Sequence, residues 1–144
     1  MDDAGAQTDS VFHHRLTPNR IGHFVVTAEL GGNPVEMLVD TGGASTVVDV
    51  AWCRDHNIPL VDTGQLGGGA GGVAMPIFAL GEVELTLNGI ALRSAGIYAI
   101  DMSHVNQGLE MRGATRVAGV IGADVLRLQK AVIDYAAEEL LLRH

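Results

Sequence analysis

The sequence predicts an all-β protein. Three observations support this: apolar and polar residues alternate in several short segments, Asn88-Gly89 is a two-residue hairpin signal, and 19 of the 144 residues are glycine while four are proline. Alternation with a period of two is typical of a strand with one buried face. Asn-Gly favours a type I′ turn because both residues adopt positive φ, and abundant glycine suits tight turns. Hydrophobic residues make up 47% of the chain, which is enough for a buried core.

The chain is expected to fold as a single domain over residues 21–144. No internal repeat or second composition zone divides this region. Residues 1–20 have no clear period and are expected to form a flexible tail or a loosely attached first strand.

The expected strands follow from alternating or β-branched segments. In chain order they cover 24–30, 35–39, 46–48, 73–80, 82–87, 90–100 and 117–121. Residues 131–142 are compatible with an amphipathic helix, but we favour a hairpin of 131–135 and 140–142 around a turn at 136–138. The expected connections are a turn at 31–34, a glycine loop at 63–72 and a polar surface loop at 101–116.

Two short helices are expected between the strands. Asp49 is a candidate cap for a helix that runs to about Asn57 and ends before Pro59. Asp124 is a candidate cap for a second helix that runs to Lys130.

Composition excludes several function classes. The net charge of -8 makes nucleic acid and anionic membrane surfaces poor partners, and no apolar run is long enough for a membrane span. Cys53 is the only cysteine, so neither an internal disulfide nor a multi-cysteine zinc site can form. No signal peptide is expected in the acidic N-terminus. The compartment stays open: cytoplasmic, or periplasmic or secreted if an export signal was removed. The chain could also be a segment of a longer one.

The segment with the clearest chemical content is Met37-Leu38-Val39-Asp40-Thr41-Gly42. An apolar strand leads into an acidic residue, so the carboxylate is expected at the edge of a low-dielectric wall. Gly42 allows a sharp backbone turn and leaves room for a ligand. Thr41 adds a hydroxyl beside the acid.

This segment resembles the active-site strand of aspartic proteases, which is hydrophobic-hydrophobic-Asp-Thr-Gly. A later segment, Val120-Ile121-Gly122-Ala123-Asp124-Val125-Leu126, is similar to the second signature of that fold, and a glycine-rich segment lies between the two. The order matches over roughly residues 21–142. The resemblance is to the single-domain retropepsin-like (retroviral-type) branch found in bacteria. It implies a closed, barrel-like acid protease fold with one or two short helices and a glycine-rich flap hairpin.

The resemblance also implies roles for individual residues. Asp40 would be catalytic, within a supporting loop of Thr41, Gly42, Gly43, Ala44 and Ser45. The flap and substrate-binding segment would be Leu66, Gly67, Gly68, Gly69, Ala70, Gly71 and Gly72. The second signature would contribute Ile121, Gly122 and Asp124. Gly43 and Ala44 stand where the family carries a small residue and then a hydroxyl or carboxylate that supports the acid, so this support is absent unless Ser45 supplies it.

The activity implied is an aspartic endopeptidase with a polypeptide substrate and no cofactor or metal. The reaction needs two carboxylates that share one proton, and this chain has one Asp-Thr-Gly. The resemblance therefore implies a homodimer in which Asp40 of each subunit meets on the two-fold axis. Two alternatives remain: half of a two-domain protease, or a catalytically weak module that binds peptides or dimerises.

Other interpretations apply to the same residues. Asp40 could be a turn acid at a strand end, and residues 67–72 could be a loop with no role in binding. G-x-G-x-x-G at 67, 69 and 72 lacks a following helix, so a dinucleotide site is disfavoured. Ser45 lacks the G-x-S-x-G setting of serine hydrolases. Residues read as structural or ordinary surface positions are Cys53, His56, His13, His14, His23, His104, Asp101, Asp134 and, as a helix cap, Asp124.

Overall fold

A computed structural model describes residues 10–68 and 74–144. Strands account for 45% of residues and helices for 16%, which confirms the all-β class. The strands are β1 (Val11–Arg15), β2 (Thr17–Pro18), β3 (Phe24–Leu30), β4 (Asn33–Val39), β5 (Val47–Asp49), β6 (Leu60–Gly68), β7 (Ala74–Leu80), β8 (Leu85–Leu87), β9 (Ile90–Ala91), β10 (Tyr98–Ile100), β11 (Gly119–Ile121), β12 (Val132–Asp134) and β13 (Glu139–Arg143). The helices are α2 (Val50–Asp55), α3 (Ser103–Met111) and α4 (Ala123–Leu128).

The larger sheet has the strand order β6-β7-β10-β5-β11-β4-β3-β8-β9, with β2 paired to β3. Its ends, β6 and β9, are edges, so the sheet is open and the expected closed barrel is wrong. The predicted strand 90–100 is also found in two pieces. It breaks into the two-residue β9 and the three-residue β10, and Gly96 between them takes a φ of 146° that interrupts the strand.

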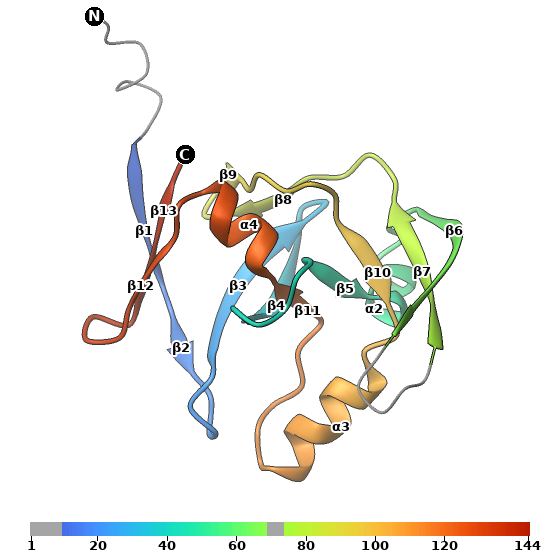
Figure 1. Cartoon of the computed structure of the whole chain (residues 1–144), viewed down its shortest axis with the longest axis horizontal. Helices are drawn as coiled ribbons and strands as arrows, with labels where there is room; N and C mark the ends of the chain where they lie inside the picture. The colour runs from blue at the N-terminus through green and yellow to red at the C-terminus, as the bar shows by residue number, and fades with distance from the viewer. Residues whose placement is uncertain (1–9, 69–73) are drawn as a thin grey trace, which may run out of the picture.

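A second sheet, which we call the terminal sheet, has the order β1-β13-β12. It pairs Val11 with Arg143 and Arg15 with Glu139 in antiparallel register. Figure 1 shows it on one side of the molecule and the β6–β7 hairpin on the other. The hairpin of β12 and β13 confirms the strand interpretation of the C-terminal region. Residues 1–9 of the predicted tail lie outside the described residues.

Local rules account for much of the sheet. The alternation over 24–30 becomes a strand whose buried and less buried residues alternate, and the β8–β9 turn has positive φ at Asn88 and Gly89, as a type I′ turn requires. The predicted strand at 73–80 is found as β7. The main core gathers the buried apolar side chains of β3, β4 and their neighbours around Leu30, Met37 and Ile121.

Two connections differ from expectation. Residues 63–68 of the predicted glycine loop extend β6, which pairs with β7 in a hairpin with a register shift between Asp62 and Gln65. Helix α3 replaces most of the surface loop at 101–116. Buried hydrogen bonds hold this helix in place: Asn106 donates from Nδ2 to the Val117 carbonyl at 2.9 Å and accepts from Val117 N at 2.7 Å.

Among the described residues, no helix is long and apolar enough to cross a membrane.

Asp49 does not cap α2 with its side chain. It occupies the N-cap position, but its Oδ1 accepts a hydrogen bond from Met102 N at 3.1 Å. The carboxylate therefore ties the start of α2 to the segment that leads into α3.

Cys53 on α2 is fully buried, and burial together with the nearby Asp49 carboxylate raises the pKa of its thiol from 9.0 to about 11. Because the thiolate is the nucleophile, we expect iodoacetamide at pH 8 to alkylate the folded protein at least about 100-fold more slowly than the protein in guanidinium chloride. Mass spectrometry of timed samples measures both rates. Similar rates in the two states would contradict the burial of this thiol.

Candidate active site

The candidate catalytic residue, Asp40, follows directly on β4. Strand β11 runs parallel beside β4 and pairs Val39 with Ile121. Asp40 N then donates to the Ile121 carbonyl at 3.0 Å, which continues this pairing by one residue. The two predicted signatures, far apart in sequence, are therefore adjacent strands, and Asp40 stands half-buried at their common end.

The loop after Asp40 folds back on its carboxylate. Gly42 N donates to Asp40 Oδ1 at 2.9 Å, and Gly43 N donates to the Asp40 carbonyl at 3.2 Å. A Cβ at Gly43 would lie 3.3 Å from Asp40 Oδ2, so the side-chain position nearest that oxygen carries no group. Ser45 is exposed, and the hydrogen bonds found at Asp40 Oδ1 and at the loop backbone involve Gly42 and Gly43 instead. The position beside Oδ2 is thus open for a donor.

Gly122 gives this loop its shape. Its Cβ, if present, would lie 2.5 Å from the Ser45 carbonyl oxygen and 2.9 Å from that of Gly43. The neighbouring Ala123 N donates to the Gly43 carbonyl at 2.7 Å. The second signature therefore needs glycine because the Asp40 loop packs backbone against backbone there.

Thr46 is the site residue that sequence reasoning missed. Its fully buried hydroxyl donates to Asp124 Oδ1 at 2.7 Å and accepts from Gly122 N at 3.0 Å. Asp124 lies in the first turn of α4, whose N-cap is Gly122, so it is not the predicted cap. The contact joins residues 78 apart, which no local pattern could indicate.

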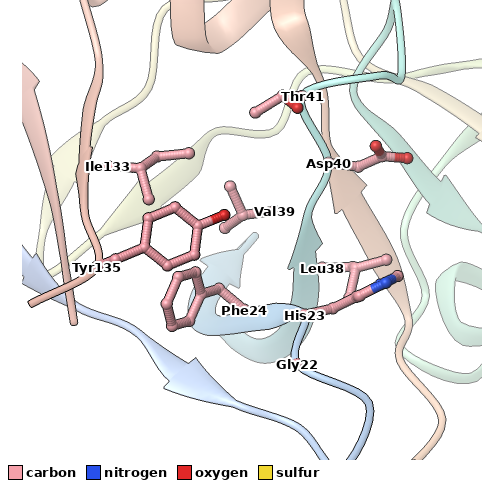
Figure 2. A pocket seen from close by; sticks show the side chains of 9 residues that line it. All are labelled: Gly22, His23, Phe24, Leu38, Val39, Asp40, Thr41, Ile133 and Tyr135. Atoms are coloured by element: carbon pink, nitrogen blue, oxygen red, sulfur yellow. The ribbon is translucent and has the colours of Figure 1, made fainter.

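A pocket of about 230 Å³ opens beside Asp40 (Figure 2). Its apolar wall comes from Phe24, Leu38, Val39, Ile133 and Tyr135, and the rings of Phe24 and Tyr135 lie 5.0 Å apart. Figure 2 shows the Asp40 carboxylate turned away from these rings. Asp40 carries the only carboxylate among the residues that line this pocket, all of which lie in the described part of the chain.

The predicted flap falls partly within the described residues. Leu66, Gly67 and Gly68 lie in β6, opposite Pro76, Met75 and Ala74 of β7, and Leu66 is 67% exposed. Gly69, Ala70, Gly71 and Gly72 lie outside the described residues. The described part of this segment is thus the end of β6, which pairs antiparallel with β7.

The remaining candidates are spread over the molecule. His56 Nδ1 donates to the Trp52 carbonyl at 2.9 Å and its ring stacks on that indole, while Cys53 is buried. Asp101 accepts from Ser103 at the start of α3, and this hydrogen bonding lowers its pKa. His14 is not the surface residue expected: it is 2% exposed. Within residues 10–68 and 74–144, no group of three or more histidine, cysteine or acidic residues could hold a metal.

Comparison with known families identifies the family of the chain. A family model described as "Aspartyl protease" matches residues 26–125, more than half of the chain. The chain belongs to the aspartyl protease family. No curated protein matches its sequence.

Solved structures place this aspartyl protease in the retropepsin-like fold. A retropepsin-like aspartic protease from Rickettsia conorii superposes with a TM-score of 0.56 at 17% identity, covering 94% of this chain and 93% of the other. The retroviral protease-like domain of Ddi1 from Leishmania major gives 0.56 at 17% identity, with 82% and 86% covered. EIAV protease, in complex with the inhibitor HBY-793, gives 0.52 at 20% identity, with 82% and 98% covered.

Proposed function

We propose that this aspartyl protease is an endopeptidase that works as a homodimer, with Asp40 of each subunit activating one water molecule. The observation that carries the proposal is the Asp40 loop. Its half-buried carboxylate accepts a hydrogen bond from Gly42 N, and the backbone of the loop packs closely against Gly122. Hydrolysis of a peptide needs a base to take a proton from water and an acid to protonate the carbonyl oxygen. One carboxylate per chain supplies only one of these roles at a time.

A second copy of the loop would complete the pair. Two carboxylates about 3 Å apart cannot both ionise, so one is protonated and acts as the acid while the other acts as the base. Thr41 is exposed next to Asp40, where its hydroxyl is free to brace the partner's loop. The β6–β7 hairpin would serve as the flap, and an extended peptide would pair with strand backbone as an added strand.

A digest of a peptide library tests this function. The full chain is incubated from pH 3 to 7 at high protein concentration, and the products are read by mass spectrometry. We expect cuts by the wild type that the Asp40→Asn variant does not make. If neither protein cuts at any pH and the variant binds peptides as the wild type does, the proposed protease function is wrong and a peptide-binding module is favoured. Cuts by this chain only after addition of a second homologous domain would favour half of a two-domain enzyme.

Gly43→Ser is expected to extend activity to lower pH. A Cβ added at Gly43 would lie 3.3 Å from Asp40 Oδ2, so a serine hydroxyl there can donate to the carboxylate after a small shift. A hydrogen bond to the ionised form favours that form, so the acid limb of the kcat/KM profile should move to lower pH. Gly43→Ala is the matched control, since it adds the same Cβ without a donor. A profile that shifts equally in both variants would contradict the role assigned to the hydroxyl.

A further inference from the structure

Two histidines from opposite ends of the described chain meet beside the terminal sheet. His14 lies on β1, and His144 follows β13; their Nε2 atoms are 3.3 Å apart. The rings form an edge-to-face pair, and Phe12 packs edge-to-face on His144 at 5.1 Å. His14 is buried, and burial is the largest cause of the lowered pKa of both histidines.

Each ring also contacts a side-chain amide of the larger body. The Asn88 amide, in the β8–β9 turn, lies 2.8 Å from His14 Nδ1. The Gln129 amide, at the C-terminal end of α4, donates from Nε2 to His144 Nδ1 at 2.8 Å. The pair therefore connects β1 and the end of β13 to both the larger sheet and α4.

Gln129 fixes where the protons lie. It is fully buried, its Oε1 accepts from Arg93 N at 2.7 Å, and its Nε2 also donates to the Arg143 carbonyl at 3.1 Å. Its amide cannot turn without losing these bonds, so His144 Nδ1 must accept. A neutral imidazole carries one proton, which places that of His144 on Nε2, where it donates to His14 Nε2. His14 then carries its proton on Nδ1. This arrangement requires the exposed Asn88 amide to rotate by 180°, so that its Oδ1 takes the place of the Nδ2 that faces His14 Nδ1 at 2.8 Å and accepts the proton.

With both rings neutral, each of the three hydrogen bonds in this series has one proton: Asn88 to His14, His14 to His144, and His144 to Gln129. An added proton leaves two hydrogens facing each other, either between the two Nε2 atoms or between His144 Nδ1 and the Gln129 amide. Within residues 10–68 and 74–144, the charged groups recorded beside the two rings do not compensate the new charge. Arg93 acts on His144, His13 acts on His14, and Arg15 lines the same pocket as His14. The carboxylate of Glu139 is already bound by His13 at 3.0 Å.

We propose that the His14–His144 pair is a pH-sensitive latch, which holds β1 and the end of β13 on the body when both rings are neutral and releases them on acidification. The inference does not rest on the proposed protease activity. The sign follows from linkage. Released histidines bind protons below their ordinary pKa of 6.5, while the closed pair resists protonation. The stability of the closed latch is therefore complete above pH 6.5 and declines as the pH falls through the lower pKa values of the folded state.

Hydrogen exchange of the full chain, read by NMR and corrected for intrinsic rates, tests the latch. The informative amides are Leu16 N, bonded to the Glu138 carbonyl, and His144 N, bonded to the Ser10 carbonyl. We expect their protection to fall at least about tenfold more than that of β3–β4 amides between pH 7.5 and 5. His14→Gln should reduce this difference, whereas His104→Gln, at an exposed position of α3, should leave it unchanged.

Two outcomes would overturn the proposal. One is terminal-strand protection in the wild type that follows the β3–β4 amides over the whole pH range. The other is a histidine titration in which His14 and His144 protonate at or above pH 6.5 with no change in strand protection. Both readouts come from the wild type, so the test does not depend on whether a variant folds.

Discussion

Asp40→Asn is expected to remove at least about 10³-fold of the peptidase activity, because asparagine can neither take a proton from water nor donate one to the carbonyl oxygen. The fold should be nearly unaffected. The asparagine Oδ1 can still accept from Gly42 N, and the backbone bonds of Asp40 to Ile121 and Gly43 do not involve the side chain.

Activity on a peptide cleaved by the wild type, measured beside thermal unfolding, separates the two effects. We expect an inactive variant whose Tm lies within a few degrees of the wild type. Glu36→Gln, an exposed carboxylate on β4, is the matched control and should keep its activity. Equal activity in Asp40→Asn and wild type would place the reaction at another site.

Gly122→Ala is expected to be the most destabilising small substitution in the active-site region. The added Cβ would meet the Ser45 carbonyl oxygen at 2.5 Å and the Gly43 carbonyl oxygen at 2.9 Å, and both are backbone atoms that cannot rotate away. The loop would have to separate from β11 and α4, and the hydrogen bonds from Ala123 N to Gly43 and from Gly122 N to Thr46 would lengthen or break. We expect a loss of about 3 kcal/mol or more in the free energy of unfolding.

Urea unfolding measures this loss, and Gly108→Ala provides the control. Gly108 lies inside α3 and a Cβ there meets nothing within 4 Å. In a helix, alanine is favoured over glycine by about 1 kcal/mol, so the control should be neutral or stabilised. A Gly122→Ala protein as stable as the wild type would contradict the packing of the two signatures against each other.

How far the sequence predicts this structure depends on the range of the interaction. Strands with a clear period of two, the Asn88-Gly89 turn and the C-terminal hairpin follow from local rules, and so does the placement of Asp40 at the end of a strand. Local rules do not predict helix α3, because its segment is polar and contains Gly108, while buried hydrogen bonds between Asn106 and Val117 hold the helix in place. The prediction of a loop is wrong here because Val117, the residue that binds Asn106, lies outside the helix.

The same reason explains the errors at the site. Asp49 lies just before α2 and Asp124 lies in the first turn of α4, and aspartate is a common capping residue. Their carboxylates instead accept hydrogen bonds from groups distant in sequence: Met102 N for Asp49 and the Thr46 hydroxyl for Asp124. The sequence predicts a surface position for His14, because nothing near it in sequence indicates that His144 and Asn88 contact its ring. A carboxylate or imidazole binds whichever group the tertiary fold brings within reach, and the sequence does not state that partner.

A subunit-mixing experiment tests the shared active site most directly. A fixed amount of wild type is mixed with increasing amounts of Asp40→Asn and incubated until the activity is constant, at concentrations where sedimentation detects dimers. If both Asp40 carboxylates are needed and subunits pair at random, activity should fall to about one half at an equimolar ratio and to about one quarter at a threefold excess of variant. Activity that stays constant or rises across the series, with exchange confirmed, would show that a subunit needs no Asp40 from its partner and would contradict the homodimeric active site.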